Sequence, residues 1–249
     1  MHLKLNHGLF QNGDEVLANI RSEEETRAIH HNVLMASTAL FMEKGFEKTT
    51  IADIAKMSGV PKSKILYEMK SKEDILSHLV TKLLAGVTRA SDAVSTALTD
   101  DRIFIFMANE VLQIYMAEMN EDMRNLYLAG YSMPKTSEAV LRRRADILYE
   151  NFGDVFPDFA LKDFYELEIA TIGIMRAYMS VPCDMYFSLE TKTDRLLTTM
   201  LKIYDVDVVK IEETKAFVRQ IDFEALARDV VDDVLLELAS MRKKENKKE

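Results

Sequence analysis

The chain has no tryptophan, one cysteine, four prolines and eight glycines in 249 residues. Because Cys183 stands alone, an intramolecular disulfide and a metal site built from several cysteines are both excluded. Scarce glycine and proline leave little material for the turns that connect β-strands or for long flexible linkers. With 48% apolar residues available for a core, this composition predicts an all-α protein.

Long apolar runs are also missing. None reaches the roughly 20 residues that a membrane-spanning helix needs, and the N-terminus lacks the apolar segment of a signal peptide. A single cysteine is typical of a reducing compartment. We therefore expect a cytoplasmic protein with no membrane partner.

Signatures of catalysis are absent as well. The sequence contains no His-x-x-x-His pair, no glycine-rich phosphate loop and no Gly-x-Ser-x-Gly elbow. His30 and His31 are adjacent on a predicted helix, so their side chains point in different directions. We expect no enzyme activity, no catalytic or metal-binding residues and no cofactor.

The net charge of −9 is unevenly distributed. Residues 21–80 carry nine basic and nine acidic residues, whereas residues 81–249 carry 22 basic and 30 acidic ones. The cations of the first region gather between Lys62 and Lys72. This pattern favours a local nucleic-acid-binding face over nonspecific coating of DNA.

That cluster lies within a pattern of two short helices joined by a turn. Thr50 and Asp53 have the spacing of a capping box, which predicts a helix start. Gly59 stands where the chain must reverse, and Pro61 suits the first turn of the next helix. A further cap at Ser71 begins a long helix. An ordinary helical hairpin would have to contain all of these signals by coincidence.

The second short helix, residues 61–70, has two faces. Ile65, Leu66 and Met69 are predicted to face the core, as are Ile51, Ile54, Ala55 and Met57 of the first helix. The outward residues are Lys62, Ser63, Lys64 and Tyr67. Cations, a hydroxyl and a phenol suit phosphates and base edges in a major groove. Lys72, at the start of the long helix, is placed to hold a phosphate.

Thr49 to Leu76, with the preceding FMEKGFEKTT, resembles the DNA-binding domain of the TetR/AcrR family of transcriptional regulators. The resemblance implies a homodimer that binds a palindromic double-stranded DNA operator and releases it when a small-molecule effector binds. It also favours a repressor over an activator. The methionine and aromatic residues of the larger domain, described below, predict a largely apolar effector. The implied DNA-binding residues are Thr50, Lys62, Ser63, Lys64, Tyr67 and Lys72.

Three residues depart from the family pattern. Leu66 and Met69 stand where the family usually has tyrosine and phenylalanine, and Glu68 adds a negative charge to the reading helix. The alternative is therefore a TetR-like helical interaction or ligand-binding module that has lost specific DNA binding.

The chain divides into an N-terminal arm (1–20), a helix-turn-helix domain (21–71) and a helical ligand-binding and dimerisation domain (72–245). Ser22 and Glu25 form a capping box that predicts a first helix from 22 to about 44, closed by Gly45. Later helices are predicted at 72–98, 102–119, 121–131, 135–152, 160–181, 188–204, 207–220 and 222–244. By analogy with the family, 160–181 and 188–204 would form the dimer contact, and Ala170, Gly173 and Ala177 would permit close approach. The role of 207–249 stays open.

An effector would bind in this larger domain, where methionines and aromatic residues make adaptable apolar walls. Candidate pocket residues are Phe104, Met107, Tyr115, Met119, Tyr127, Tyr131, Tyr149, Phe152, Met175, Arg176 and Tyr178. For each apolar one, a place in the plain core is the stronger interpretation. Arg176 interrupts an apolar segment, and it fits an acidic partner across an interface better than an anionic ligand.

Overall fold

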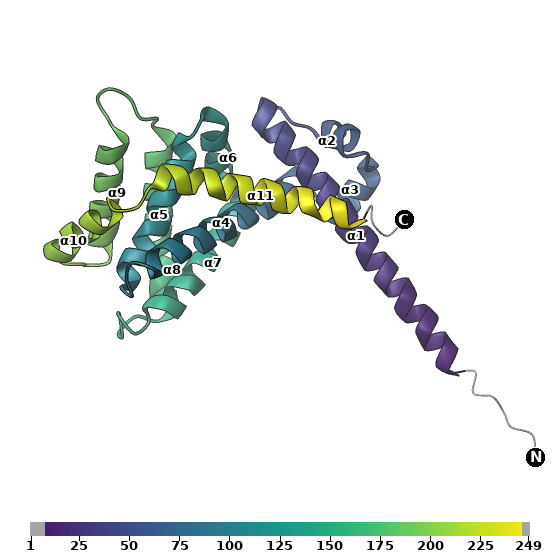
Figure 1. Cartoon of the computed structure of the whole chain (residues 1–249), viewed down its shortest axis with the longest axis horizontal. Helices are drawn as coiled ribbons and strands as arrows, with labels where there is room; N and C mark the ends of the chain where they lie inside the picture. Colours follow the sequence, from purple (N-terminus) through teal and green to yellow (C-terminus); the bar gives the residue numbers. More distant parts are fainter. Residues whose placement is uncertain (1–7, 246–249) are drawn as a thin grey trace, which may run out of the picture.

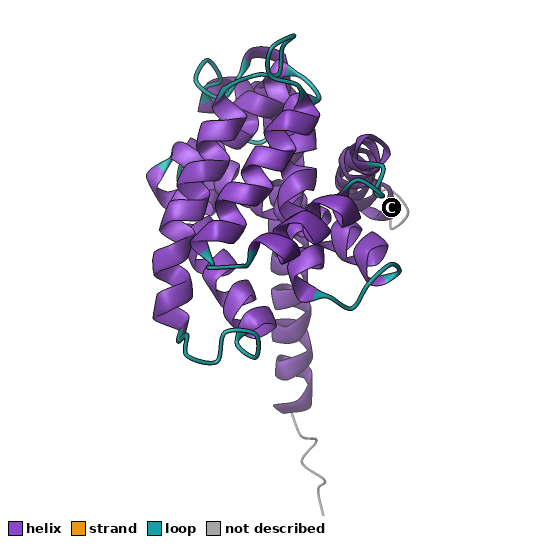
Figure 2. Ribbon diagram, turned by 90° about the vertical axis from the view of Figure 1, so that its left-hand side faces the viewer, coloured by secondary structure: helices purple, strands orange, loops and turns teal. Residues whose placement is uncertain are grey.

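The computed structural model describes the backbone of residues 8–245 and the side chains of residues 24–150, 152–234 and 236. The described part is built of helices without strands, which confirms the all-α prediction (Figure 2). The helices are α1 Gly8–Lys44, α2 Ile51–Ser58, α3 Lys62–Met69, α4 Lys72–Thr96, α5 Arg102–Glu118, α6 Glu121–Ser132, α7 Pro134–Phe152, α8 Leu161–Ser180, α9 Leu189–Ile203, α10 Val208–Val218 and α11 Phe223–Glu245.

The helices form two connected parts (Figure 1). Helices α1 to α3 pack together at one end, and α4 leads from them into a larger body made of α5 to α10. Helix α11 runs lengthwise across the molecule and contacts α1, α4 and α5. Within the C-terminal segment 207–249, whose role the sequence left open, helix α11 therefore packs across both parts of its own chain.

The first helix begins earlier than the sequence predicted. Helix α1 starts at Gly8, so the expected start at Ser22 is wrong and Ser22 lies inside the helix. The capping box marks where a helix can begin, but no proline precedes Ser22 to stop the helix from extending backward. Each glycine in this stretch costs only about 1 kcal/mol. The remaining helix ends agree with the predicted ranges to within about two residues.

Helices α4 and α6 cross at a glycine. A Cβ at Gly130 of α6 would lie 2.8 Å from Cγ2 and 3.2 Å from Cγ1 of Val80 on α4. Val80 is buried, so it has little room to move. Gly130 therefore sets how closely the body can approach the helix that leads to α1–α3.

One lysine ties α4 to the loop after α1. Lys72 Nζ donates hydrogen bonds to the carbonyl oxygens of Phe46 (2.7 Å), Glu47 (3.3 Å) and Thr49 (3.0 Å). The same ammonium lies 4.2 Å from the centroid of the Phe46 ring. An ammonium has three N–H donors, and all three are used here. Lys72 thus clamps the start of α4 to the α1–α2 loop.

We predict that Gly130→Ala lowers the free energy of unfolding by about 1–3 kcal/mol, because the added methyl overpacks the contact with Val80. Urea unfolding measures this change. Ser132→Ala, an exposed change at the end of the same helix, is the control and should stay within about 0.5 kcal/mol of the parent protein. Equal stability of the two variants would contradict the close approach.

We predict that Lys72→Met lowers the free energy of unfolding by about 1–2 kcal/mol, since three carbonyl groups lose their donor while the aliphatic stem is kept. Lys62→Met, at an exposed lysine on α3, is the matched control and should be neutral. A Lys72→Met protein as stable as the control would show that the clamp contributes nothing.

Candidate DNA-binding face and body cavity

The capping box at the start of α2 is present as the sequence predicted. The Asp53 amide donates to Thr50 Oγ1 (3.1 Å), and the Thr50 amide donates to Asp53 Oδ2 (2.9 Å). Lys44 Nζ lies 2.8 Å from the same carboxylate oxygen. The Lys44 ammonium and the Thr50 hydroxyl and amide together hold the pKa of Asp53 well below its usual range. The cap thus joins the end of α1 to the start of α2.

The turn between α2 and α3 follows the predicted chemistry. Gly59 has φ of 71°, a left-handed conformation that glycine adopts without steric cost, and its amide donates to the Ala55 carbonyl oxygen (3.1 Å). Pro61 stands immediately before the first residue of α3. The turn places α3 across α2 with one side open to solvent.

That open side of α3 contains most of the predicted contact residues. Lys62 and Ser63 are exposed, and Tyr67 is 78% exposed. Ile65 and Met69 are buried, as expected, but the prediction of a core position for Leu66 is wrong because it is 39% exposed. A helix of two turns buries a single narrow stripe, and Leu66 lies about 100° away from Ile65 around the axis.

A similar correction applies to α2. Ile54 is fully buried and Ile51 and Ala55 are partly buried against the core, whereas Met57 is 50% exposed. Met57 lies near the C-terminal end of α2, on the side that faces solvent. Its predicted place in the apolar stripe is therefore wrong.

Glu68 and Lys64 lie on the flank of α3 that faces α1. Lys64 Nζ is 3.5 Å from Glu68 Oε1 and 3.9 Å from Glu25 Oε1 on α1. The Glu68 side chain is only 13% exposed, and its other oxygen lies 3.7 Å from His30 Nε2. The negative charge of Glu68 is thus turned inward and balanced by Lys64, so it does not project from the exposed side of α3.

The remaining two predicted contact residues are both engaged in structural bonds. Thr50 is exposed, and its hydroxyl lies 2.7 Å from Asp53 Oδ2. Lys72 uses its ammonium in the clamp described above, so a phosphate contact would require one of those bonds to be exchanged. Lys62, Ser63 and Tyr67 therefore form the most available part of the face. We call these three residues, with Leu66, the α3 outer face.

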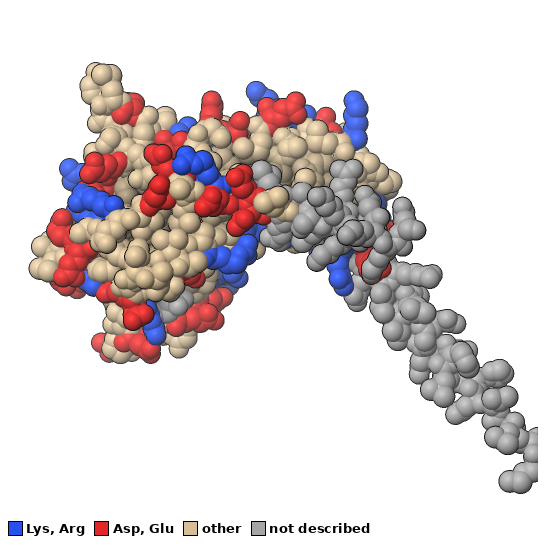
Figure 3. All heavy atoms as spheres, in the orientation of Figure 1, with Lys and Arg blue, Asp and Glu red and all other residues tan. Residues whose placement is uncertain are grey.

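Around the body, acidic and basic side chains alternate on the side drawn in Figure 3, without a broad basic region.

No helix among residues 8–245 is long and apolar enough to cross a bilayer. The described side chains likewise contain no group of three or more His, Cys, Asp or Glu that could hold a metal ion.

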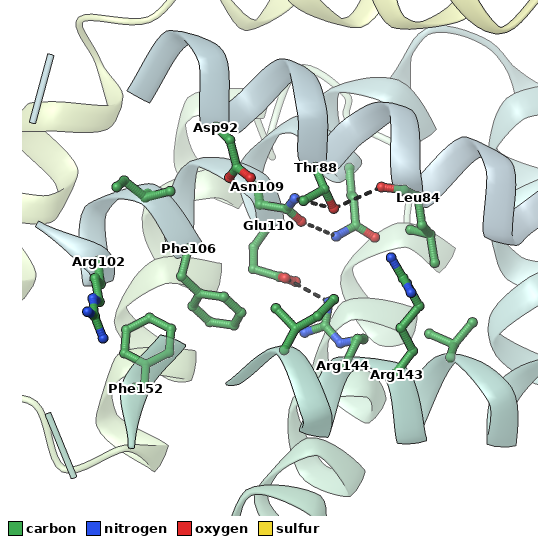
Figure 4. Close-up of a pocket in the computed structure, with 14 residues that line it drawn as sticks. Leu84, Thr88, Asp92, Arg102, Phe106, Asn109, Glu110, Arg143, Arg144 and Phe152 are labelled. Carbon is green, nitrogen blue, oxygen red and sulfur yellow. Dashed lines mark hydrogen bonds and ion pairs between the residues drawn. The ribbon is translucent and has the colours of Figure 1, made fainter. Parts of the chain in front are cut away.

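A cavity of about 130 Å³ lies in the body between α4, α5 and α7 (Figure 4). Its lining is formed by Leu84, Thr88, Asp92, Arg102, Ile105, Phe106, Asn109, Glu110, Gln113, Val140, Arg143, Arg144, Ile147 and Phe152. Asp92, Arg102 and Arg143 are exposed, whereas Glu110 and Arg144 are buried. The cavity therefore has a charged mouth, apolar walls and a polar floor.

The floor belongs to a buried hydrogen-bonded network. Arg144 Nη1 donates to Glu110 Oε1 (2.7 Å), and Arg144 Nε donates to Glu168 Oε2 (2.5 Å) on α8. The Tyr204 hydroxyl donates to Glu168 Oε1 (2.8 Å). Burial raises the pKa of Glu110, and the neighbouring Arg144 guanidinium opposes that shift. Arg144 is thus shared by two carboxylates.

A second polar chain extends along α5 and α4. Asn109 Nδ2 donates to Ser91 Oγ (3.2 Å) and Thr88 Oγ1 (3.3 Å), and its oxygen accepts from Gln113 Nε2 (3.1 Å). The Tyr131 hydroxyl donates to Gln113 Oε1 (2.6 Å). Burial raises the pKa of Tyr131, so its hydroxyl stays protonated. Polar groups on the cavity wall are held in fixed orientations by these bonds.

Of the eleven residues predicted for a pocket, Phe152 lines this cavity. Met107, Tyr127, Tyr131 and Met175 are fully buried core residues, in line with the stronger interpretation given above. Phe104 stacks on Phe217, Tyr115 packs against Phe223, and Tyr178 lies near Phe187. Met119, Tyr149 and Arg176 are exposed. The structure does not bring these side chains together into one site.

The polar lining residues were not among the residues predicted for a pocket, although one local signal in the sequence pointed to them. Glu110 is the single charged residue between the two ends of α5, in the otherwise uncharged segment IFIFMANEVLQIYMA. A charge at the centre of an apolar helix needs a buried partner. That partner, Arg144, lies 34 positions away in sequence, where no local pattern reveals it.

Comparison with known proteins agrees with this arrangement. Residues 33–79 match the family model described as bacterial regulatory proteins, tetR family. Over 108 residues the chain is 26% identical to the HTH-type transcriptional regulator TtgR of Pseudomonas putida, an alignment that covers 41% of this chain and 51% of the relative. The chain thus aligns with about half the length of that regulator.

Solved structures share the fold over most of the chain. RolR in complex with resorcinol superposes with a TM-score of 0.61 at 16% identity, covering 78% of this chain and 95% of RolR. RolR without ligand gives 0.55 at 16% identity, covering 76% and 95%. The capped helix-turn-helix of α2 and α3 thus lies within residues 33–79, which match the tetR family of bacterial regulatory proteins, and the described fold resembles that of RolR.

Proposed function

We propose that this protein is a cytoplasmic transcriptional repressor that binds a palindromic operator as a homodimer and releases it when a small effector occupies the body cavity. The observation that carries this proposal is the α3 outer face, where Lys62, Ser63 and Tyr67 stand exposed. Helix α3 lies between two helices that start with side-chain caps, α2 at Thr50 and α4 at Ser71. Cation, hydroxyl and phenol on one short helix match the donors that contact phosphates and base edges.

Dimerisation is supported by one exposed side of α8. Ile169 is 56% exposed, and Ala170 and Ala177 are exposed beside it. A Cβ at Gly173, on the same side, would meet no atom within 4 Å. Small residues around a protruding isoleucine allow another α8 to approach closely, as the family resemblance implies. Two copies joined here would present two α3 helices to successive major grooves.

Helix α4 connects the cavity with the DNA-binding part. Leu84 and Thr88 line the cavity, while Lys72 and the Ser71–Asp74 cap hold the other end of α4 beside α1 and α3. A ligand changes the position of α4 only if it binds one arrangement more tightly than another. In the proposed mechanism, effector binding favours an arrangement in which the two α3 outer faces no longer match the operator.

A module that has lost DNA binding is the second candidate, and the exposed Leu66 is the observation in its favour. The inward position of Glu68 counts against it, because that charge does not confront the DNA backbone. Selection of binding sites from random duplex DNA separates the two candidates. Recovery of a short palindrome supports the repressor, and failure to enrich any sequence supports the module.

We predict that Lys62→Ala weakens binding to the selected palindrome at least tenfold and flattens the salt dependence of binding. Each lost phosphate contact reduces the magnitude of the negative slope of log K against log salt by about 0.9. A dimer that loses one contact in each copy therefore has a slope smaller in magnitude by about 2. Fluorescence anisotropy at several salt concentrations measures both effects. Lys202→Ala, at an exposed lysine on α9, is the matched control. An unchanged slope in Lys62→Ala would remove Lys62 from the interface.

We predict that Ala170→Arg weakens the dimer at least tenfold, because it places a bulky charge where two α8 helices approach. Sedimentation velocity across a range of protein concentrations measures this change. Ala93→Arg, at an exposed alanine on α4, is the control and should leave the dimer intact. A dimer of unchanged strength in Ala170→Arg would place the interface elsewhere.

A further inference from the structure

The floor of the body cavity contains two buried polar atoms without a partner among the described residues. These atoms are Glu110 Oε2 and Arg144 Nη2. Glu110 is fully buried and Arg144 is 8% exposed. An unsatisfied buried group of this kind carries the full cost of its desolvation, more so when it is charged. A molecule that enters the cavity and pairs with both atoms would recover that cost.

The two atoms require opposite hydrogen-bonding partners. An ionised carboxylate oxygen accepts, so Glu110 Oε2 requires a donor, while a guanidinium nitrogen donates, so Arg144 Nη2 requires an acceptor. A single hydroxyl group supplies both, with its hydrogen directed to Glu110 and its oxygen lone pairs to Arg144. An ether or ketone satisfies only Arg144, and an ammonium satisfies only Glu110.

Charge around the floor disfavours an anion there. Arg144 already pairs with both Glu110 and Glu168, so this buried trio has one more carboxylate than cation when all three are ionised. A carboxylate placed beside them would add a further negative charge in a region of low dielectric. A cation would be attracted by that net charge, but it has no acceptor for Arg144 Nη2 and would leave this atom unpaired. A neutral group that both donates and accepts is the one that satisfies both atoms.

The walls of the cavity determine the size and chemistry of the rest of the ligand. Phe106 and Phe152 form an edge-to-face pair with ring centroids 5.4 Å apart, and Leu84, Ile105 and Val140 complete the apolar lining. The volume of about 130 Å³ is close to the roughly 150 Å³ of an engineered apolar cavity that takes up benzene. One ring fits this space, and the aromatic wall suits an aromatic ring.

We propose that the cavity selects a neutral, single-ring aromatic molecule bearing a hydroxyl group, whose O–H donates to Glu110 and whose oxygen accepts from Arg144 while its ring lies against Phe106 and Phe152. The role of this molecule as effector rests on the proposed function, but its binding does not. Phenol and toluene form a matched pair of probes, because they have nearly equal size and differ in the hydroxyl. Benzoate tests the exclusion of an anion.

Isothermal titration of the full chain with each probe, without DNA, tests the proposal. We expect phenol to bind at least tenfold more tightly than toluene, and benzoate to bind more weakly than phenol. Toluene binding as tightly as phenol would overturn the role of the polar floor. Preference for benzoate would overturn the neutral class, and absence of binding by all three would overturn the site.

Two variants locate the binding. Glu110→Gln keeps the side-chain shape but removes the charged acceptor, so we expect phenol affinity to fall at least tenfold while Glu166→Gln, on the exposed side of α8, leaves it unchanged. If Glu110→Gln does not fold, Ile105→Phe serves instead, because it fills the cavity from a partly exposed wall position. Phenol affinity unchanged by a folded cavity variant would place the binding elsewhere.

These outcomes are separable from the test of the proposed function. A protein that binds the selected palindrome but no phenol keeps the repressor function and loses this inference. A protein that binds phenol at Glu110 but enriches no DNA sequence keeps the inference and supports the module that no longer binds DNA.

Discussion

The ion pairs of Arg144 with Glu110 and Glu168 are the constraint on which the body depends. They join α7 to α5 and α8 at a buried point, and Tyr204 adds a bond from the end of α9. Loss of Arg144 would leave two carboxylates buried without their cation, which is among the most destabilising changes a core can suffer. The same cluster forms the cavity floor, so stability of the body and selection of a ligand rest on one group of side chains.

Helix α4 connects that cluster with the proposed DNA-binding part, α1 to α3. Its middle lines the cavity, and its first turn is held by the Ser71 cap and by the Lys72 clamp on the α1–α2 loop. The start of α7 is tied to the same turn, since the Lys135 amide donates to Glu73 Oε1 (2.8 Å). Helix α11 packs along α4 through Val230 and Val234 at Gly86. A shift of α7 against α5 would therefore reach α3 through packed helices.

The sequence predicted what depends on local chemistry. The Thr50 cap, the Gly59 turn and most helix ends follow from residues a few positions apart, and the structure confirms them. It could not predict what depends on distant neighbours: whether Leu66 faces solvent, that Lys72 bonds backbone oxygens 23 to 26 positions earlier, or that Arg144 meets Glu110. The residues predicted for a pocket do not lie together for the same reason. Helical spacing predicts which residues are buried, but it does not distinguish a residue of the packed core from one that lines a cavity. The lone charge at Glu110 was the one local sign of the site.

A hydroxyl-radical footprint of the selected palindrome, bound by the full chain, tests whether two α3 outer faces contact one operator. We expect two protected half-sites whose centres lie about 10 base pairs apart, or a whole multiple of that distance, on one face of the duplex. Protection of a single half-site, or a uniform weak protection along the duplex, would contradict it.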